Sequence, residues 1–68
     1  MYRNLKAELV RHNISNIDVA KKLGLTKGTA SLKINGKTKI SLEEAFDIQD
    51  LIHEKSGITI PIEELFKA

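Results

Sequence analysis

The feature that most constrains the fold is the stretch over residues 15–36, which carries two sets of helix-end signals close together. Ser15 and Asp18 form the Ser-x-x-acid pattern of a capped helix N-terminus. Gly24 stands where a helix ends in a left-handed residue, a conformation that glycine adopts without a side-chain clash. Thr26 is a suitable N-cap for a second helix, which the closing Asn-Gly pair would stop. We therefore expect two short helices joined by a tight turn.

The remaining sequence predicts further helices around this pair. Residues 2–12 have leucines one turn apart, and Pro61 suits the first turn of a short helix over residues 61–67. A Ser-Leu-Glu-Glu capping box opens a helix over about residues 41–55. Its apolar residues cover a wide stripe, so we expect this helix to be the central member of the core. The stripe comprises Leu42, Ala45, Phe46, Ile48, Leu51 and Ile52.

Length and composition favour one small helical domain. The chain has 68 residues, near the lower size at which a single core is stable without help, and no cysteine for a disulfide or a thiolate metal site. No apolar run approaches the roughly 18 residues of a membrane span, and residues 1–6 do not resemble a signal peptide. We therefore expect an all-α fold, a compact bundle of about five short helices. It would be a single domain over residues 1–68, cytoplasmic and without a membrane partner.

Charge is divided unevenly along the chain. Residues 1–39 contain nine Lys or Arg against two Asp or Glu, whereas residues 40–68 contain two against seven. The overall formal charge of +2 therefore hides a basic half and an acidic half. A basic face attracts polyanions and an acidic opposite side orients their approach, although solvated helices also carry such charges without a ligand.

The two short helices form the pattern of a helix-turn-helix, whose second helix is shaped to enter the major groove of DNA. On a helical wheel at about 100° per residue, Ala30 and Ile34 share one side and would face the core. The opposite side carries Gly28, Leu32 and Asn35. A recognition helix presents its N-terminal residues to base edges, so this opposite side is predicted to read DNA.

Four residues are predicted to face bases, namely Lys27, Gly28, Thr29 and Leu32. Lys27 can donate to guanine, Thr29 can bond to a base edge, and Leu32 can contact a thymine methyl group. Gly28 would let the backbone come close to DNA, which explains a residue that costs about 1 kcal/mol relative to alanine inside a helix. Plainer interpretations are a phosphate contact for Lys27, capping for Thr29, and cover for a core edge or a subunit contact for Leu32.

Phosphate contacts are predicted around this helix. Asn16 opens the first helix of the pair, where backbone N–H groups and the helix dipole favour a phosphate. The other candidates follow the second helix closely and would position the protein without reading sequence. They are Asn35, Lys37, Thr38, Lys39 and Ser41, with Lys21, Lys22 and Lys33 as weaker candidates. The alternative for the whole set is a solvated basic loop.

Two runs of residues carry a family resemblance. They are Val19-Ala20-x-x-Leu23-Gly24-Leu25-Thr26 and the following Lys-Gly-Thr-Ala-Ser-Leu-Lys-Ile-Asn35-Gly36-Lys37. Ala20 matches the small residue where two helices cross, and Gly24 matches the turn glycine, so the chain resembles the Cro/C1-type helix-turn-helix family of phage repressors and related bacterial regulators. The resemblance covers nearly the whole chain, since residues 41–45 and the short C-terminal helix are similar to prophage-type members.

The resemblance implies a lambda repressor-like DNA-binding domain with double-stranded DNA as its partner. It places Asn16, Asn35 and Ser41 at phosphate positions and Lys27, Gly28, Thr29 and Leu32 at base-facing positions. Three departures matter. Asn16 stands where the family often has Gln, the Lys27-Gly28 pair replaces Gln-Ser, and Ala30 is smaller than the usual aliphatic residue. No base preference is therefore transferred from the family.

Nothing in the sequence predicts catalysis, a cofactor, a metal site or a small-molecule substrate. His12 and His53 lack a third ligand at metal-binding spacing, and both are expected on helix surfaces. The glutamate pairs at 43–44 and 63–64 lie in predicted first turns, where the helix dipole explains them.

The leading hypothesis is a sequence-specific binder of double-stranded DNA, a phage- or prophage-type transcriptional repressor. A domain of this size makes a small interface, so we expect a homodimer on half-sites about one helical turn apart. Candidates for the dimer surface are Ile58, Ile60, Ile62 and Phe66, with packing inside the monomer as the equal alternative. The alternative function is a protein-interaction module, antitoxin- or adaptor-like, which an exposed Leu32 would favour.

Overall fold

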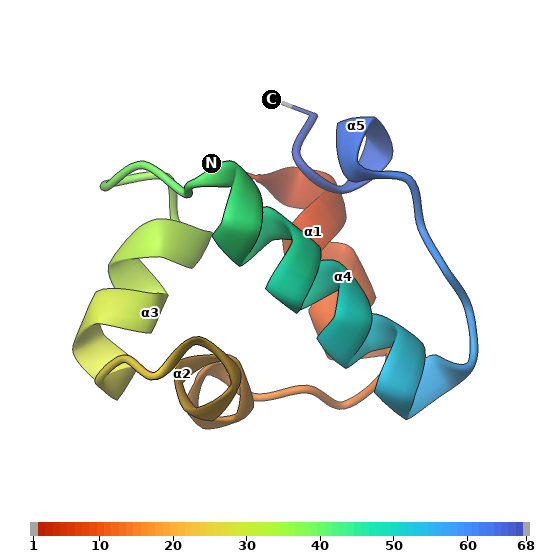
Figure 1. Cartoon of the computed structure of the whole chain (residues 1–68), viewed down its shortest axis with the longest axis horizontal. Coiled ribbons are helices and arrows are strands. Elements are labelled where there is room, and N and C mark those ends of the chain that lie inside the picture. Colours follow the sequence, from red (N-terminus) through yellow and green to blue (C-terminus); the bar gives the residue numbers. More distant parts are fainter. Residues whose placement is uncertain (1, 68) are drawn as a thin grey trace.

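The computed structural model describes residues 2–67, which form helices and connecting segments without a strand (Figure 1). The helices in chain order are α1 (Arg3–Arg11), α2 (Asn16–Leu23), α3 (Lys27–Ile34), α4 (Leu42–Ser56) and α5 (Ile62–Leu65). The predicted all-α bundle of five short helices is therefore confirmed. In Figure 1, α4 runs through the middle of the molecule, with α2 and α3 on one side of it and α1 and α5 on the other. Over the described part of the chain, every helix is too short or too polar to cross a membrane.

Two predicted capping boxes form as reciprocal hydrogen bonds. At the start of α2, the Asp18 N–H donates to Ser15 Oγ at 3.2 Å, and the Ser15 N–H donates to Asp18 Oδ2 at 3.0 Å. At the start of α4, the Glu44 N–H donates to Ser41 Oγ at 3.1 Å, and the Ser41 N–H donates to Glu44 Oε1 at 3.0 Å. Each box satisfies N–H groups that lack a partner within the helix, so both helices begin where the sequence predicts.

The turn between α2 and α3 also has the predicted form. Gly24 ends α2 in the left-handed conformation, with φ of 71°. The Leu25 N–H donates to the Ala20 carbonyl at 2.9 Å, which closes the C-terminal turn of α2. Thr26 then caps α3, because its Oγ1 accepts from the Thr29 N–H at 3.2 Å. This short connection leaves α3 packed against α2.

The core takes side chains from every helix. The largest fully buried ones are Leu5, Val19, Ile48, Ile52 and Leu65. In α3, Ala30 and Ile34 are 0 % and 3 % exposed, which confirms the predicted inward side of this helix. Ala20 of α2, which the resemblance places where the two helices cross, is also buried.

Two residues of the apolar stripe predicted for α4 do not lie in the core. Leu42 is 66 % exposed and Phe46 is 48 % exposed, so the prediction is wrong for both. At about 100° per residue they lie about 120° and 160° around α4 from the buried Ile48, beyond the width of one covered side. On this flank Gln49 Nε2 donates to the Ile60 carbonyl at 2.7 Å, which holds the segment before α5 along α4.

Helix ends differ slightly from the prediction at both ends of the chain. The first helix covers residues 3–11 rather than 2–12, and Pro61 is the N-cap residue of α5 rather than part of its first turn. His12 follows α1 with a side chain only 16 % exposed, and its Nε2 lies 3.2 Å from Glu8 Oε1. The expectation of a surface histidine is therefore wrong for His12, whereas His53 is exposed.

Candidate nucleic-acid interface

One side of α3 is turned to solvent at the edge of the molecule (Figure 1). Opposite the buried Ala30 and Ile34, Gly28 is exposed and Leu32 is 47 % exposed, and Lys27 is exposed in the first turn. These three belong to the predicted base-facing set. The structure therefore presents a helix that is held from one side and open on the other.

Gly28 has open space around it. A Cβ built at this position would meet no atom within 4 Å, and the residue lies inside α3 with an ordinary negative φ. Alanine would fit there and favour the helix by about 0.5–1 kcal/mol. The packing of the described residues therefore does not require a glycine at this position.

Thr29 is half-buried and takes part in the cap of α3. Its backbone N–H donates to Thr26 Oγ1, and its own Oγ1 accepts from the Thr26 hydroxyl at 3.0 Å. A threonine hydroxyl can accept and donate at once, so the Thr29 proton is still available for a base edge. Capping and base contact are thus compatible at this position.

The loop from Asn35 to Ser41 connects α3 to α4. Lys37, Thr38 and Lys39 are exposed in it, and Ser41 is exposed as the N-cap residue of α4. In Figure 1 this loop lies at the same edge of the molecule as α3. Most of the predicted phosphate contacts therefore lie just beyond the C-terminal end of α3.

Asn35 is held by contacts within the protein. Its Nδ2 donates to the Ser31 carbonyl at 2.9 Å, and its Oδ1 accepts from Lys6 Nζ at 2.8 Å. The amide therefore joins the end of α3 to α1, a role that the sequence did not indicate. A phosphate contact by Asn35 stays a prediction.

Asn16 is half-buried at the N-terminus of α2, next to a negative charge. The hydrogen bonds that Asp18 accepts from Ser15 hold the pKa of the Asp18 carboxyl below its ordinary value. Since the charged Asp18 lies in the first turn, it offsets part of the attraction of this helix terminus for a phosphate.

Lys22 and Lys33, two of the weaker candidates for phosphate contacts, form ion pairs with glutamates of α4. Lys22 Nζ lies 2.6 Å from Glu54 Oε1, and this contact lowers the pKa of Glu54 and raises that of Lys22. Lys33 Nζ lies 3.1 Å from Glu44 Oε1 and donates to the Lys39 carbonyl at 2.8 Å. Lys21 is exposed.

Comparison with protein families matches residues 5–56 to a helix-turn-helix family, and this match covers most of the chain. The chain belongs to the Cro/C1-type helix-turn-helix family. Membership implies DNA binding and transcriptional regulation, in a family that is typically non-enzymatic. Comparison with curated proteins and with solved structures gives no match.

In this helix-turn-helix protein, α2 and α3 are the two helices of the motif, and α1 and α4 support them. The family match begins within α1 and ends at the last residue of α4, so it includes every predicted DNA-contact residue. Over residues 2–67, no group of three or more His, Cys, Asp or Glu side chains is placed to hold a metal ion.

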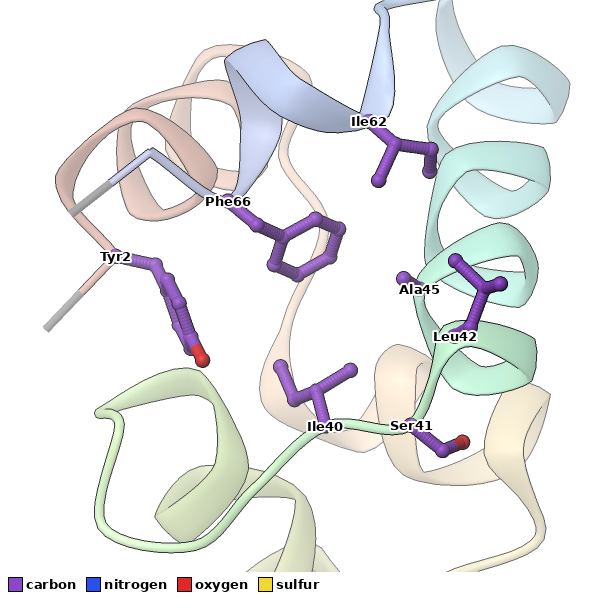
Figure 2. Close-up of a pocket in the computed structure, with 7 residues that line it drawn as sticks. All are labelled: Tyr2, Ile40, Ser41, Leu42, Ala45, Ile62 and Phe66. Atoms are coloured by element: carbon purple, nitrogen blue, oxygen red, sulfur yellow. The ribbon is translucent and has the colours of Figure 1, made fainter.

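A second surface feature lies beside α4. It is an apolar hollow of about 320 Å³, lined by Tyr2, Ile40, Ser41, Leu42, Ala45, Ile62 and Phe66 (Figure 2). The rings of Tyr2 and Phe66 meet edge to face, with centroids 5.4 Å apart. Of the residues predicted for a dimer surface, Ile62 and Phe66 line this hollow and Ile58 is 53 % exposed. Ile60 and Phe66 are in part packed against the core.

Proposed function

We propose that this helix-turn-helix protein binds double-stranded DNA sequence-specifically and inserts α3 into the major groove. The observation that carries the proposal is the division of α3 into two sides. Ala30 and Ile34 are buried on one side, whereas Gly28 and Leu32 face solvent on the other, and Lys27 is exposed in the first turn. A helix buried on one side only can enter a groove about 12 Å wide while its core contacts stay intact.

In this proposal, residues in the first turns of α3 contact the bases. Lys27 donates to the acceptor atoms of guanine, the Thr29 hydroxyl bonds to a base edge, and Leu32 packs on a thymine methyl group. The missing side chain of Gly28 lets the backbone of α3 approach the floor of the groove. Support comes from the exposure of Lys27, Gly28 and Leu32 and from the open space at Gly28.

Phosphate contacts in this proposal flank α3 on both sides. Asn16 contributes at the N-terminus of α2, and the connecting loop contributes the larger group. That group comprises Lys37, Thr38, Lys39 and Ser41, all of them exposed. Asn35 is the weakest member of the set, because its amide already bonds to Ser31 and Lys6.

We further infer a role as a transcriptional repressor of the prophage type. A protein bound across an operator excludes polymerase simply by occupying the site, which requires DNA binding and no additional chemistry. The prophage type is supported by the resemblance of residues 41–45 and of the short C-terminal helix to prophage-type members.

A twofold homodimer would let this small DNA-binding domain contact a second half-site. Leu42 lines the hollow of Figure 2 and is 66 % exposed, with Phe46 one turn further along α4. In a twofold interface the same patch of both copies meets, so this apolar patch would be covered by its own copy in the second protomer. Analytical ultracentrifugation should therefore show a dimer that Leu42→Glu dissociates, and a monomer at all concentrations would contradict this part of the proposal.

The DNA-binding proposal is tested by affinity for a random-sequence duplex at two salt concentrations, followed by selection of bound duplexes. Several phosphate contacts should make the affinity fall steeply between about 50 and 200 mM salt. Selection should recover a motif with half-sites about 10 base pairs apart. Salt-independent or undetectable binding would contradict the proposal.

One observation favours a second candidate, a protein-interaction module of the antitoxin or adaptor kind. Leu32 is an apolar residue, 47 % exposed on the open side of α3, and such a residue also suits a protein partner. Leu32→Lys separates the two functions. Added charge should preserve or strengthen general DNA affinity, whereas it should abolish binding to a partner that covers this side chain.

A further inference from the structure

Lys33 lies in the last turn of α3, and its ammonium group bonds to two other parts of the protein. Its side chain is only 16 % exposed. Nζ donates to the Lys39 carbonyl at 2.8 Å and to Glu44 Oε1 at 3.1 Å. One ammonium group thus joins three elements, namely α3, the connecting loop and the first turn of α4.

The acceptor of this ammonium group is itself fixed in place. Glu44 Oε1 also accepts from the Ser41 N–H at 3.0 Å, as part of the capping box of α4. The hydrogen bond from the Ser41 backbone and the contact with Lys33 together hold the pKa of Glu44 below its ordinary value, so its carboxylate stays charged at neutral pH. Lys33 is therefore anchored to a helix terminus rather than to a mobile side chain.

The connecting loop is consequently attached at two points. Near its start, the Lys37 N–H donates to the Leu32 carbonyl at 2.9 Å. Near its end, the Lys39 carbonyl accepts from Lys33. The exposed side chains of Lys37, Thr38 and Lys39 project from the backbone between these points.

We propose that Lys33 is a positioning residue, which holds the backbone of residues 37–39 in the conformation that presents their side chains to DNA phosphates. It acts through the Lys39 carbonyl and Glu44 and does not itself touch the nucleic acid. This inference rests on the proposed DNA binding. Positioning matters because ordering a loop in advance removes the entropy cost of ordering it on binding.

Lys22 provides a matched control. It also joins the motif to α4, with Nζ 2.6 Å from Glu54 Oε1, but its ammonium group is not bonded to the connecting loop. Lys22→Met and Lys33→Met remove the same charge and one ion pair each. A general electrostatic or stability effect should therefore be similar in the two variants.

The experiment has two readouts, the mobility of the loop in the free protein and the affinity for a duplex recovered by selection. In Lys33→Met, amide hydrogen exchange and ¹⁵N relaxation of residues 37–40 should show a more mobile loop than in wild type or Lys22→Met. Operator affinity should fall about tenfold further than in Lys22→Met, as expected for a lost charge-assisted hydrogen bond. Lys33→Arg, which keeps the donor and the charge, should restore most of the affinity.

Other results overturn the inference. Unchanged loop mobility together with reduced affinity would mean that Lys33 contacts DNA directly, and equal losses in both Met variants would mean that only charge or stability matters.

If Lys33→Met does not fold, Glu44→Gln replaces it, since glutamine retains the capping box. That variant adds net positive charge, so stronger DNA binding would contradict positioning and weaker binding would support it. Wild-type protein without DNA affinity would refute the proposed function, whereas the loop readout would still test the contact itself.

Discussion

Two groups of lysines in the basic half differ in what their ammonium groups contact. Lys27, Lys37 and Lys39 are exposed on α3 and in the loop that follows it. Lys22 and Lys33 meet glutamates of α4 at 2.6 and 3.1 Å. The acidic half therefore neutralises part of the basic half and holds it in place. Net charge alone consequently does not identify the lysines that face a ligand.

The largest expected effect tests whether the two halves form one folding unit. Ile52 of α4 is fully buried in a core that it shares with side chains of the basic half. Ile52→Ala should lower the free energy of unfolding by about 2–5 kcal/mol, through lost burial and a cavity. Urea unfolding followed by circular dichroism should show a single transition at lower urea.

The control for this prediction is Val10→Ala, since Val10 is also an aliphatic helix residue but is 80 % exposed. Its free energy of unfolding should change by less than about 0.5 kcal/mol. Two separate transitions in Ile52→Ala would show that the acidic half unfolds independently of the basic half.

The exposed lysines should themselves differ in what they contribute to binding. Lys27→Ala should reduce discrimination between the selected operator and a single-base variant by about 1–3 kcal/mol, because a base contact is lost. Lys37→Ala should weaken binding to all duplexes alike, because a phosphate contact is lost. The slope of log affinity against log salt concentration should therefore become shallower by about one. Competition binding measures both, and unchanged operator preference in Lys27→Ala would make our assignment of Lys27 wrong.

Gly28→Ala should separate stability from function. Alanine fits the open space at this position and should raise the free energy of unfolding by up to about 1 kcal/mol. Affinity for the operator should nevertheless decrease, because the added methyl group occupies space that DNA would use. A variant that is more stable and binds equally well would show that DNA does not approach Gly28 closely.

The smallest expected effect comes from acid, which breaks the contacts between the halves. The pKa values of Glu54 and Glu44 are below the ordinary 4.5 of a glutamate, chiefly through the hydrogen bond from Lys22 and through the capping bond from Ser41, respectively. At a pH above the ordinary pKa, these carboxylates are charged and stabilise the fold. The stabilisation is lost as the pH falls through their lower pKa values in the folded state. The urea midpoint should decrease below about pH 5.

Glu54→Gln provides the comparison for the acid prediction. Without this carboxylate, the midpoint should already be lower at neutral pH and should change less on acidification. An identical pH profile in wild type and variant would show that the Lys22–Glu54 pair adds no stability, as is common for exposed ion pairs.

Features that depend on near neighbours in sequence could be predicted, and those that depend on packing could not. Both capping boxes join residues three apart, and the left-handed turn at Gly24 needs one glycine, so short patterns were sufficient. The Lys33–Glu44 and Lys22–Glu54 pairs join residues 11 and 32 positions apart, and their existence depends on how α4 crosses the motif.

The same limit explains the errors on α4. Leu42 and Phe46 look like core residues because an apolar pattern does not reveal which flanks of a helix its neighbours cover. By contrast, the inward side of α3 was predicted correctly, since Ala30 and Ile34 are one turn apart on one side of the helix and Leu32 lies on the other. The residues proposed to contact DNA follow from that choice, and they stay predictions until DNA is bound.

The most direct test of the account is an NMR titration of ¹⁵N-labelled protein with the selected operator duplex. If α3 enters the major groove, the largest shift changes should fall on Lys27–Leu32 of α3 and on the loop over residues 36–41. Shift changes confined to the hollow and α5, with the amides of α3 unchanged, would contradict the insertion of α3 into the major groove.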